Sequence, residues 1–392
     1  MLKVIDNQFN FLGAVDRYTS YMPARSFFGV GIFELHLPFT TEYSKILVEE
    51  NIIFKETNKP YIILYKEINS SDNTMVIKGE ELKSYLGRWI TKPPVNRAYD
   101  RVNANAETIM KEYVRRNCKT PNLIVAKDLK RGDKFVFQTR YKQLDMELEK
   151  IGLVSGLGWT VKLDIDNKKF VFDVIEGLDR SINQAINSRA IFSDDFENVT
   201  EQTLTKSKVG YKNVAIVAGR GEGRDRIISV IGEGDGFDRY ETFIDAADVE
   251  NEEDLPDRGA QKLSEMQKVE SFESRILSNS NLVYEKDYNI GDTVTIQNKE
   301  WDVTLNSVIK SITEIYEEGG FRLEANFGNN TPTISQVIKK QLDKPVVENV
   351  GGFNFGDLDG GSTKKRHNVT IDMGKANDFI AIILEGGNIN GN

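Results

Sequence analysis

The segment from Phe192 to Val249 constrains the fold most, because short apolar runs alternate there with glycine, aspartate and arginine. Runs such as NVAIVAG and RIISVIGEG have the length of single strands, and glycine and aspartate favour the turns between strands. The segment contains neither histidine nor cysteine. It therefore predicts a β framework, a barrel or a sandwich, whose side chains give shape rather than catalysis.

The composition predicts a folded protein of several domains. The chain has 392 residues, of which 39% are hydrophobic and 28% charged, and at roughly 100 to 200 residues per domain it should hold about two to four domains. The net charge is -9, from 51 basic and 60 acidic residues. A protein that binds the phosphates of nucleic acid is expected to carry a positive charge instead. Stable nucleic-acid binding is not expected, although an acidic surface would let DNA pass without sticking.

The ends of the sequence give no membrane signal. MLKVIDNQFNFLG lacks a basic segment followed by an apolar run, and the run from Phe379 to Leu384 is too short to span a bilayer. We expect synthesis in the cytosol, with no membrane anchor. The single cysteine, Cys118, cannot form an internal disulfide, and its helical surroundings favour a buried structural thiol.

Hydrophobic periodicity divides the chain into four parts and predicts an α+β, mainly β, fold. We expect the following parts: a β domain at 1–95, a mixed α/β insert at 96–180, a second barrel-like β domain at 181–340 with one long helix near 255–275, and a Gly/Asn-rich tail at 341–392. Strand alternation is clearest where Phe33, Leu35 and Leu37 alternate with Glu34 and His36.

Helical spacing marks three segments. The apolar positions that carry it are Ala106, Ile109, Met110, Tyr113 and Val114, then Leu144, Leu148 and Ile151, and finally Leu263, Met266 and Val269. The third stripe follows the acidic run ENEEDLPDRG, which includes Glu250, Glu252, Glu253 and Asp254, where a helix dipole favours acids.

Two short patterns occur twice in the sequence, and each repeat is called an echo. The pattern of Val15, Tyr18, Gly31 and Phe33 recurs late in the chain as Ile312, Tyr316, Gly320 and Phe321. The run GLDR at 177–180 recurs as GFDR at 236–239. Any two amphipathic hairpins look alike, so the pattern alone favours coincidence for the first echo, and repeated turn chemistry explains the second.

Candidate chemical sites are weak. The glycines at Gly219, Gly221 and Gly223 follow a strand, but the β-branched run after them predicts a hairpin turn rather than a phosphate loop. The carboxylates Asp194, Asp195 and Glu197 could serve glycoside hydrolysis, but a solvated turn is the favoured interpretation.

The remaining candidates also favour structural roles. His36 and His367 are the only histidines, so neither a His-pair metal motif nor a Ser/His/acid set is expected. The pairs Asp179-Arg180 and Asp238-Arg239 could be interface contacts or turn clamps within the chain. Three tryptophans could stack on sugars, but apolar neighbours favour core packing for Trp89, Trp159 and Trp301. We predict no catalytic, cofactor-binding or metal-binding residue, and the sequence does not locate an interface.

The N-terminal VIDNQFNFLGAVDRYTSYMPARSFFGVGIFELHLP resembles the opening of siphophage tail-tip hub proteins, the ReqiPepy siphovirus family that includes the front part of tail-associated lysins. The motifs that follow keep their order: LKSYLGRWI, AETIMKEYVRRNC, GLGWTVKLD, FDVIEGLDRS, IFSDDFENV, YKNVAIVAGRGEGRDR, GFDRYETFIDAADV, DYNIGDTVTI and FRLEANFG. The resemblance covers about residues 1–335 and is specific by order and spacing.

The resemblance implies a non-enzymatic virion protein related to the myophage baseplate hub. A homotrimer with two barrel-like hub domains per chain would match a sixfold tail ring and present threefold symmetry to tip components. The implied partners are the distal tail protein ring, the tape-measure protein, and a tail fibre or receptor-binding tip protein, with DNA passing through. Many relatives continue into a hydrolase or a fibre, so a chain that stops at Asn392 suggests an adaptor.

Two other function classes remain open. A tail-associated cell-wall hydrolase would depend on acids such as Asp194 and Asp195. A carbohydrate-binding adhesin would use the tryptophans.

Overall fold

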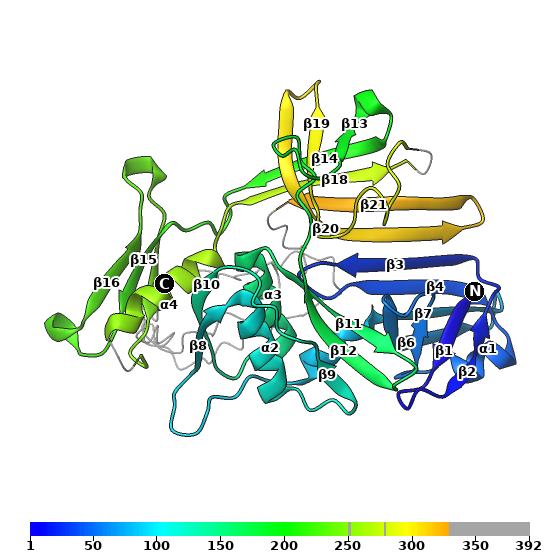
Figure 1. Ribbon diagram of the computed structural model, residues 1–392, viewed down its shortest axis with the longest axis horizontal. Helices are drawn as coiled ribbons and strands as arrows, with labels where there is room; N and C mark the ends of the chain where they lie inside the picture. Colours follow the sequence, from blue (N-terminus) through cyan, green and yellow to red (C-terminus); the bar gives the residue numbers. More distant parts are fainter. Residues whose placement is uncertain (250–251, 278–279, 329–392) are drawn as a thin grey trace, which may run out of the picture. The chain divides into compact units, whose positions relative to one another are not determined.

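A computed structural model of the protein describes residues 1–249, 252–277 and 280–328 (Figure 1). The chain divides into Met1–Thr331 and Pro332–Asn392, and the account below concerns the described residues of the first. The predicted tail at 341–392, His367 and Glu250 lie outside the described residues. The α+β, mainly β, fold is confirmed. The domain bounds at residues 95, 180 and 340 stay a proposal.

One sheet of 13 strands dominates the described residues. Its strands are β1 (Leu2–Ile5), β2 (Phe11–Val15), β3 (Ser20–Ser26), β4 (Ile32–Pro38), β5 (Ile52–Phe54), β6 (Pro60–Asn69), β7 (Thr74–Glu81), β13 (Ile191–Ser193), β14 (Val199–Ser207), β18 (Val269–Ile276), β19 (Thr293–Asn298), β20 (Val303–Glu317) and β21 (Gly320–Gly328). The main path runs β14-β18-β21-β20-β3-β4-β7-β6-β5-β1-β2, and β19 joins it through β20, with β13 beside β19.

The two echoing hairpins of the sequence lie side by side in this sheet (Figure 1). β3 pairs antiparallel with β20, and Tyr21 stands opposite Tyr316. β4 alternates as predicted, because Phe33, Leu35 and Leu37 are buried while their neighbours are not. The early and late β regions therefore share one sheet and one seam.

A mixed α/β region follows β7 and includes the helices expected within 96–180. It consists of the 3-10 helix η1 (Leu82–Arg88), β8 (Asp100–Asn105), α2 (Ala106–Asn117), β9 (Leu123–Val125), β10 (Lys134–Thr139), α3 (Leu144–Ser155), β11 (Gly158–Asp164) and β12 (Lys169–Ile175). The predicted stripes of α2 and α3 are buried in one core with Trp159. Gly156 ends α3 with a φ of 74°, which glycine adopts without steric cost. A short helix, α1 (Thr41–Ile46), lies outside this region.

A smaller sheet lies between β14 and β18 in the chain. It contains β15 (Val214–Ala218), β16 (Ile228–Gly232) and β17 (Glu241–Asp245), and α4 (Leu255–Ser264) packs against it. Short 3-10 turns are η2 (Asp194–Phe196), η3 (Gly223–Asp225), η4 (Gly236–Asp238) and η5 (Glu252–Asp254). β15 pairs antiparallel with β16, so the glycine-rich segment between them is a hairpin connection, as predicted.

The predicted long helix near 255–275 is wrong in length. α4 ends at Ser264, Met266 lies in a turn, and Val269 begins β18. β18 pairs with β14 on one side and with β21 on the other. Hydrogen bonding along both edges, together with burial of Phe272 and Ile276, outweighs the local helical spacing.

Lys310 of β20 is a half-buried lysine. Burial lowers the pKa of Lys310 to about 8, although Glu149 of α3 opposes this shift. The charged ammonium thus destabilises the folded protein at neutral pH. None of the described helices has both the length and the apolar composition needed to cross a membrane.

We expect Lys310→Met to raise the free energy of unfolding at pH 7, by about 1–3 kcal/mol. The gain should shrink as the pH rises from about 8, because the wild-type folded state then loses its proton while the unfolded state keeps it until about pH 10.4. Chemical unfolding between pH 6 and 10.5 measures this, with Lys299→Met as the control, since the Lys299 side chain is 78% exposed. A gain that does not change with pH would contradict the account.

Candidate functional site: an open polar face over a buried ionic junction

One face of the long sheet is polar from β6 across to β14. Residues opposite each other on antiparallel strands share a face, and the register therefore identifies its members. The pairs Glu34 with Lys78 and Met22 with Glu34 place β3, β4 and β7 on this face. Thr313 continues the face into β20, because it pairs with Ala24 and with Glu324 of β21.

Carboxylates outnumber cations on this face. The acids are Glu34, Glu67, Glu80, Glu273, Glu317 and Glu324, and the bases are Lys78, Arg275 and Arg322. Their cross-strand contacts include Lys78 Nζ to Glu34 Oε2 at 3.0 Å and Arg322 to Glu317 at 3.1 Å. The hydrogen bond from Lys78, helped by one from His36, lowers the pKa of Glu34. The face thus stays acidic at neutral pH.

The edges of β14 and β6 are among those of the long sheet without a partner strand in the described part of the chain. β14 pairs only with β18. β6 pairs with β5 from Pro60 to Ile62 only, so its outer half, residues 64–69, has β7 on one side and no strand on the other. Leu64, Tyr65 and Ile68 in that outer half are 42%, 45% and 48% exposed. Such edges can accept further strands.

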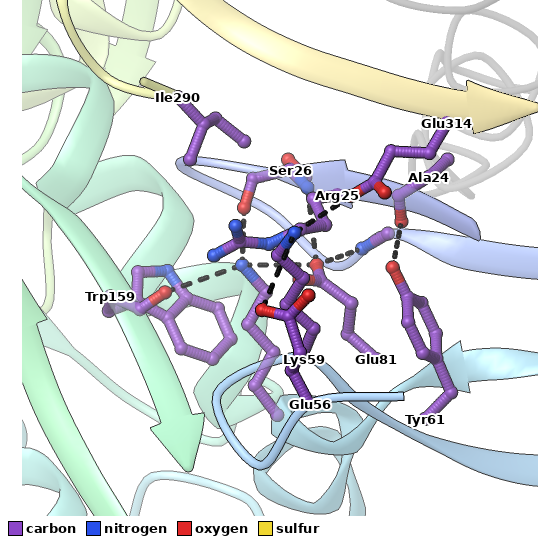
Figure 2. Close-up of polar contacts among 12 residues, drawn as sticks. Ala24, Arg25, Ser26, Glu56, Lys59, Tyr61, Glu81, Trp159, Ile290 and Glu314 are labelled. Atoms are coloured by element: carbon purple, nitrogen blue, oxygen red, sulfur yellow. Dashed lines mark hydrogen bonds and ion pairs between the residues drawn. The ribbon is translucent and has the colours of Figure 1, made fainter. Parts of the chain in front are cut away.

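Behind the polar face, a network of ionised side chains joins the early and late β regions (Figure 2). Arg25 of β3, Glu81 of β7 and Glu314 of β20 belong to it. Lys59 lies just before β6, and its Nζ is 3.0 Å from Glu314 Oε1 and 2.9 Å from Glu285 Oε1. This contact spans the seam between residues 59 and 314, which are far apart in the sequence.

Glu81 is the centre of the other half of this network (Figure 2). Its Oε2 accepts hydrogen bonds from Gly31 N at 2.7 Å and Ser26 N at 3.2 Å, and it lies 3.3 Å from Lys83 Nζ. Lys83 also donates to the carbonyl oxygens of Ser26 at 2.5 Å and Trp159 at 3.3 Å. One carboxylate and one ammonium therefore connect β3 and β7 to the mixed α/β region.

Burial and charge oppose each other in this network. Burial lowers the pKa of Lys83, although Glu81 opposes it. Burial alone would also lower the pKa of Lys59, but Glu314 and Glu285 outweigh it and raise that pKa. Both lysines therefore depend on their carboxylate partners for a stable charged form.

The sequence did not single out this network. Glu314 stands between Ile312 and Tyr316 on the inward side of β20, and a carboxylate in an apolar stripe is a signal that a buried cation faces it. Lys59 and Lys83 lie in a turn and in η1, where no periodicity marks them as buried.

The candidate acids of the sequence lie elsewhere. Asp194, Asp195 and Glu197 are exposed and lie in or next to η2, where Ser193 Oγ accepts a hydrogen bond from Asp195 N and Lys299 Nζ is 3.0 Å from Asp195 Oδ2. His36 lies on the polar face, and its Nε2 is 2.5 Å from Glu34 Oε1. The described ranges contain no group of three His, Cys, Asp or Glu side chains placed to hold a metal ion.

The arginines of the two Asp/Arg pairs form ion pairs within the chain, although not with their adjacent aspartates. Arg180 Nε is 2.8 Å from Asp292 Oδ2, and Arg239 Nε is 2.6 Å from Glu241 Oε1. Cys118 is only partly buried, with its Sγ 3.5 Å from Thr120 Oγ1.

Core packing of the tryptophans is confirmed for Trp159, which is fully buried. It is wrong for Trp301, which is 43% exposed because it lies in the turn between β19 and β20. Trp89 is half-buried against the core of the mixed region.

We expect Glu81→Gln to destabilise the protein by about 3–5 kcal/mol, because it leaves Lys83 buried without a counter-charge. Chemical unfolding measures this loss. The control is Glu34→Gln, whose partner Lys78 is 47% exposed and for which we expect a loss of about 1 kcal/mol or less. The double variant Glu81→Gln/Lys83→Met should recover much of the loss. Equal effects of Glu81→Gln and Glu34→Gln would contradict the junction.

Comparisons with known proteins identify the family. The model of the Siphovirus ReqiPepy6 Gp37-like protein family matches residues 1–329. The 43 kDa tail protein of prophage MuSo2 from Shewanella oneidensis is 12% identical with a TM-score of 0.53, covering 83% of this chain and 97% of that chain. A tail protein from Neisseria meningitidis MC58 is 11% identical with a TM-score of 0.52, covering 83% of this chain and 95% of that one.

These two structures show a shared fold. No curated protein matches the sequence. The family match extends over most of the chain and includes both hairpins of the seam. The chain therefore belongs to the Siphovirus ReqiPepy6 Gp37-like family of phage tail proteins.

Proposed function

We propose that the protein is a structural, non-enzymatic hub at the tail tip, in which three copies form a ring around the path of the DNA. The acid-rich open face of the long sheet carries this proposal, because a polar face on an otherwise well-packed sheet suits a water-filled bore. The virion tail tip is then its location, after assembly in the host cytoplasm.

The free edges support ring formation. The outer half of β6 and the edge strand β14 lie at opposite ends of the polar face. Pairing of β6 in one copy with β14 in the next would continue the sheet and satisfy backbone groups on both edges. Such a head-to-tail contact makes a closed ring when the rotation between copies fits.

The two similar hairpins of each chain support the proposed fit of a trimer to a sixfold ring. Each chain contributes two similar hairpins, β3–β4 and β20–β21, on either side of one seam. Three chains then present six similar hairpins to a sixfold distal tail protein ring, and threefold symmetry to a tail fibre or receptor-binding tip protein. The tape-measure protein and the DNA would occupy the bore.

No specific contact favours a cell-wall hydrolase. Asp194 and Asp195 lie on an exposed turn, whereas a catalytic acid of a glycoside hydrolase lies in apolar surroundings.

Imaging of native tails should show three copies at the tip. The double variant Ile68→Lys/Thr205→Lys adds charge to the edges of β6 and β14, and we expect it to fail to assemble into tails while the isolated chain still folds. Val230→Lys, on an exposed strand of the smaller sheet, is the matched control and should assemble. One copy or six copies at the tip, or normal assembly of the edge variant, would contradict the ring.

The acidic face predicts weak interaction with DNA. We expect no stable duplex binding by the wild-type protein at low salt, since binding to phosphates needs cations that release counterions. Glu67→Lys/Glu273→Lys should retain duplex DNA in a strongly salt-dependent way and slow DNA ejection. Glu222→Lys/Glu241→Lys, whose sites lie off the long sheet, should change ejection little. Tight wild-type binding that weakens steeply with salt would contradict the conduit.

A further inference from the structure

We propose that a basic pocket beside Trp89 binds an anionic carbohydrate, meaning a sugar that carries a phosphate or carboxylate group. This goes beyond the hub function and would give the protein a ligand of its own. The pocket has a volume of about 390 Å³, and Trp89, Lys92, Asp100, Arg116 and Lys119 are among the residues that line it.

Three elements build the pocket. The segment after η1 supplies Trp89 and Lys92, the start of β8 supplies Asp100, and the end of α2 supplies Arg116. Lys92 N donates to Asn117 Oδ1 at 2.9 Å, which holds the first segment against the helix end. Trp89 Nε1 donates to Thr120 Oγ1 at 2.9 Å, which fixes the indole. The lining is therefore positioned without a ligand.

The pocket is basic on an acidic protein. Arg88, which also lines it, is engaged by Glu50 at 2.8 Å and 2.9 Å. Arg116 contacts Asp100 at 2.6 Å and also Glu112. Lys92 and Lys119 are exposed, and no carboxylate of the described residues pairs with either. These two ammonium groups are free to bind an anion.

The dipole of α2 explains only part of the positive charge around the pocket. Cations near the C-terminal end of a helix interact favourably with its carbonyl groups, and this accounts for the position of Arg116. The helix dipole does not account for Lys92, which comes from a different segment of the chain. The same dipole disfavours an anion alone, so a ligand needs further contacts.

Asp100 indicates what those contacts are. Its residue is 1% exposed, and its Oδ1 pairs with Arg116 while its Oδ2 has no hydrogen-bond partner in the described part of the chain. A buried acceptor without a donor is destabilising. Burial also raises the pKa of Asp100, against the effect of Arg116. A ligand hydroxyl could supply the missing donor, whereas a bare anion would be repelled by this carboxylate.

An acidic sugar satisfies all three features of the pocket. Its acid group pairs with Lys92 and Lys119, a ring hydroxyl donates toward Asp100, and its C–H face packs on the indole of Trp89, whose π face attracts positive C–H edges. An acidic peptide offers the anion and amide donors, but it lacks several hydroxyl donors on one rigid ring.

Calorimetry on the full-length protein tests this with five probes: glucose 6-phosphate, glucose, inorganic phosphate, a hexaglutamate peptide and polygalacturonate. We expect glucose 6-phosphate to bind at least about tenfold more tightly than glucose or phosphate, because each charge-assisted contact contributes about that factor. Polygalacturonate separates the two sources of such a sugar. Binding of the polymer together with the monomer supports a surface glycan, and binding of the monomer alone supports a free sugar phosphate.

The lysine variant Lys92→Gln/Lys119→Gln should weaken glucose 6-phosphate binding at least about tenfold and leave glucose binding unchanged. The control Lys162→Gln/Lys169→Gln changes exposed lysines on β11 and β12 and should bind like the wild type. Trp89→Leu, which removes the π face, should lose the sugar preference while keeping its far-UV circular dichroism. Phosphate binding as tightly as glucose 6-phosphate, tighter binding of hexaglutamate, or no effect of the lysine variant would each overturn the proposal.

Discussion

The pairing of β3 with β20 is the contact on which the rest of the structure depends. It joins two hairpins that are nearly 300 residues apart, at a register that places Tyr21 opposite Tyr316. A shift of one residue would turn every side chain of β20 to the other face. Ile312 and Glu314 would then leave the core, and the acids of the open face would turn inward. The register thus sets both faces of the sheet.

The buried ions reinforce this register. Lys59 reaches Glu314 across the seam. Glu81 holds Lys83 and accepts hydrogen bonds from the backbone N–H groups of Ser26, at the end of β3, and Gly31, in the loop that follows. Burying charges costs more than simple apolar packing would. A register that separates these partners would leave them unpaired in the core, so the ions penalise wrong pairings more strongly than they stabilise the correct one.

The open polar face and the basic pocket carry opposite charges on different parts of the described chain. The acidic groups spread along the strands of the long sheet, as the proposed bore for a polyanion requires. The cations of the pocket gather where the segment after η1 meets the end of α2, beside a buried aspartate. Net charge therefore describes neither surface, because each depends on which strands and helices are brought together.

The sequence by itself determined the local elements. Period-2 alternation specified β4, and the 3.6-residue period specified α2 and α3, because one buried face is enough to select each geometry. The glycines after β15, followed by a β-branched run, specified a hairpin turn. The helical spacing gave a wrong prediction at Val269, because pairing with β14 and β21 makes β18 a strand. Only the tertiary structure decided the seam, the ion pairs and the pocket, because they join residues whose separation in the chain leaves no periodic trace.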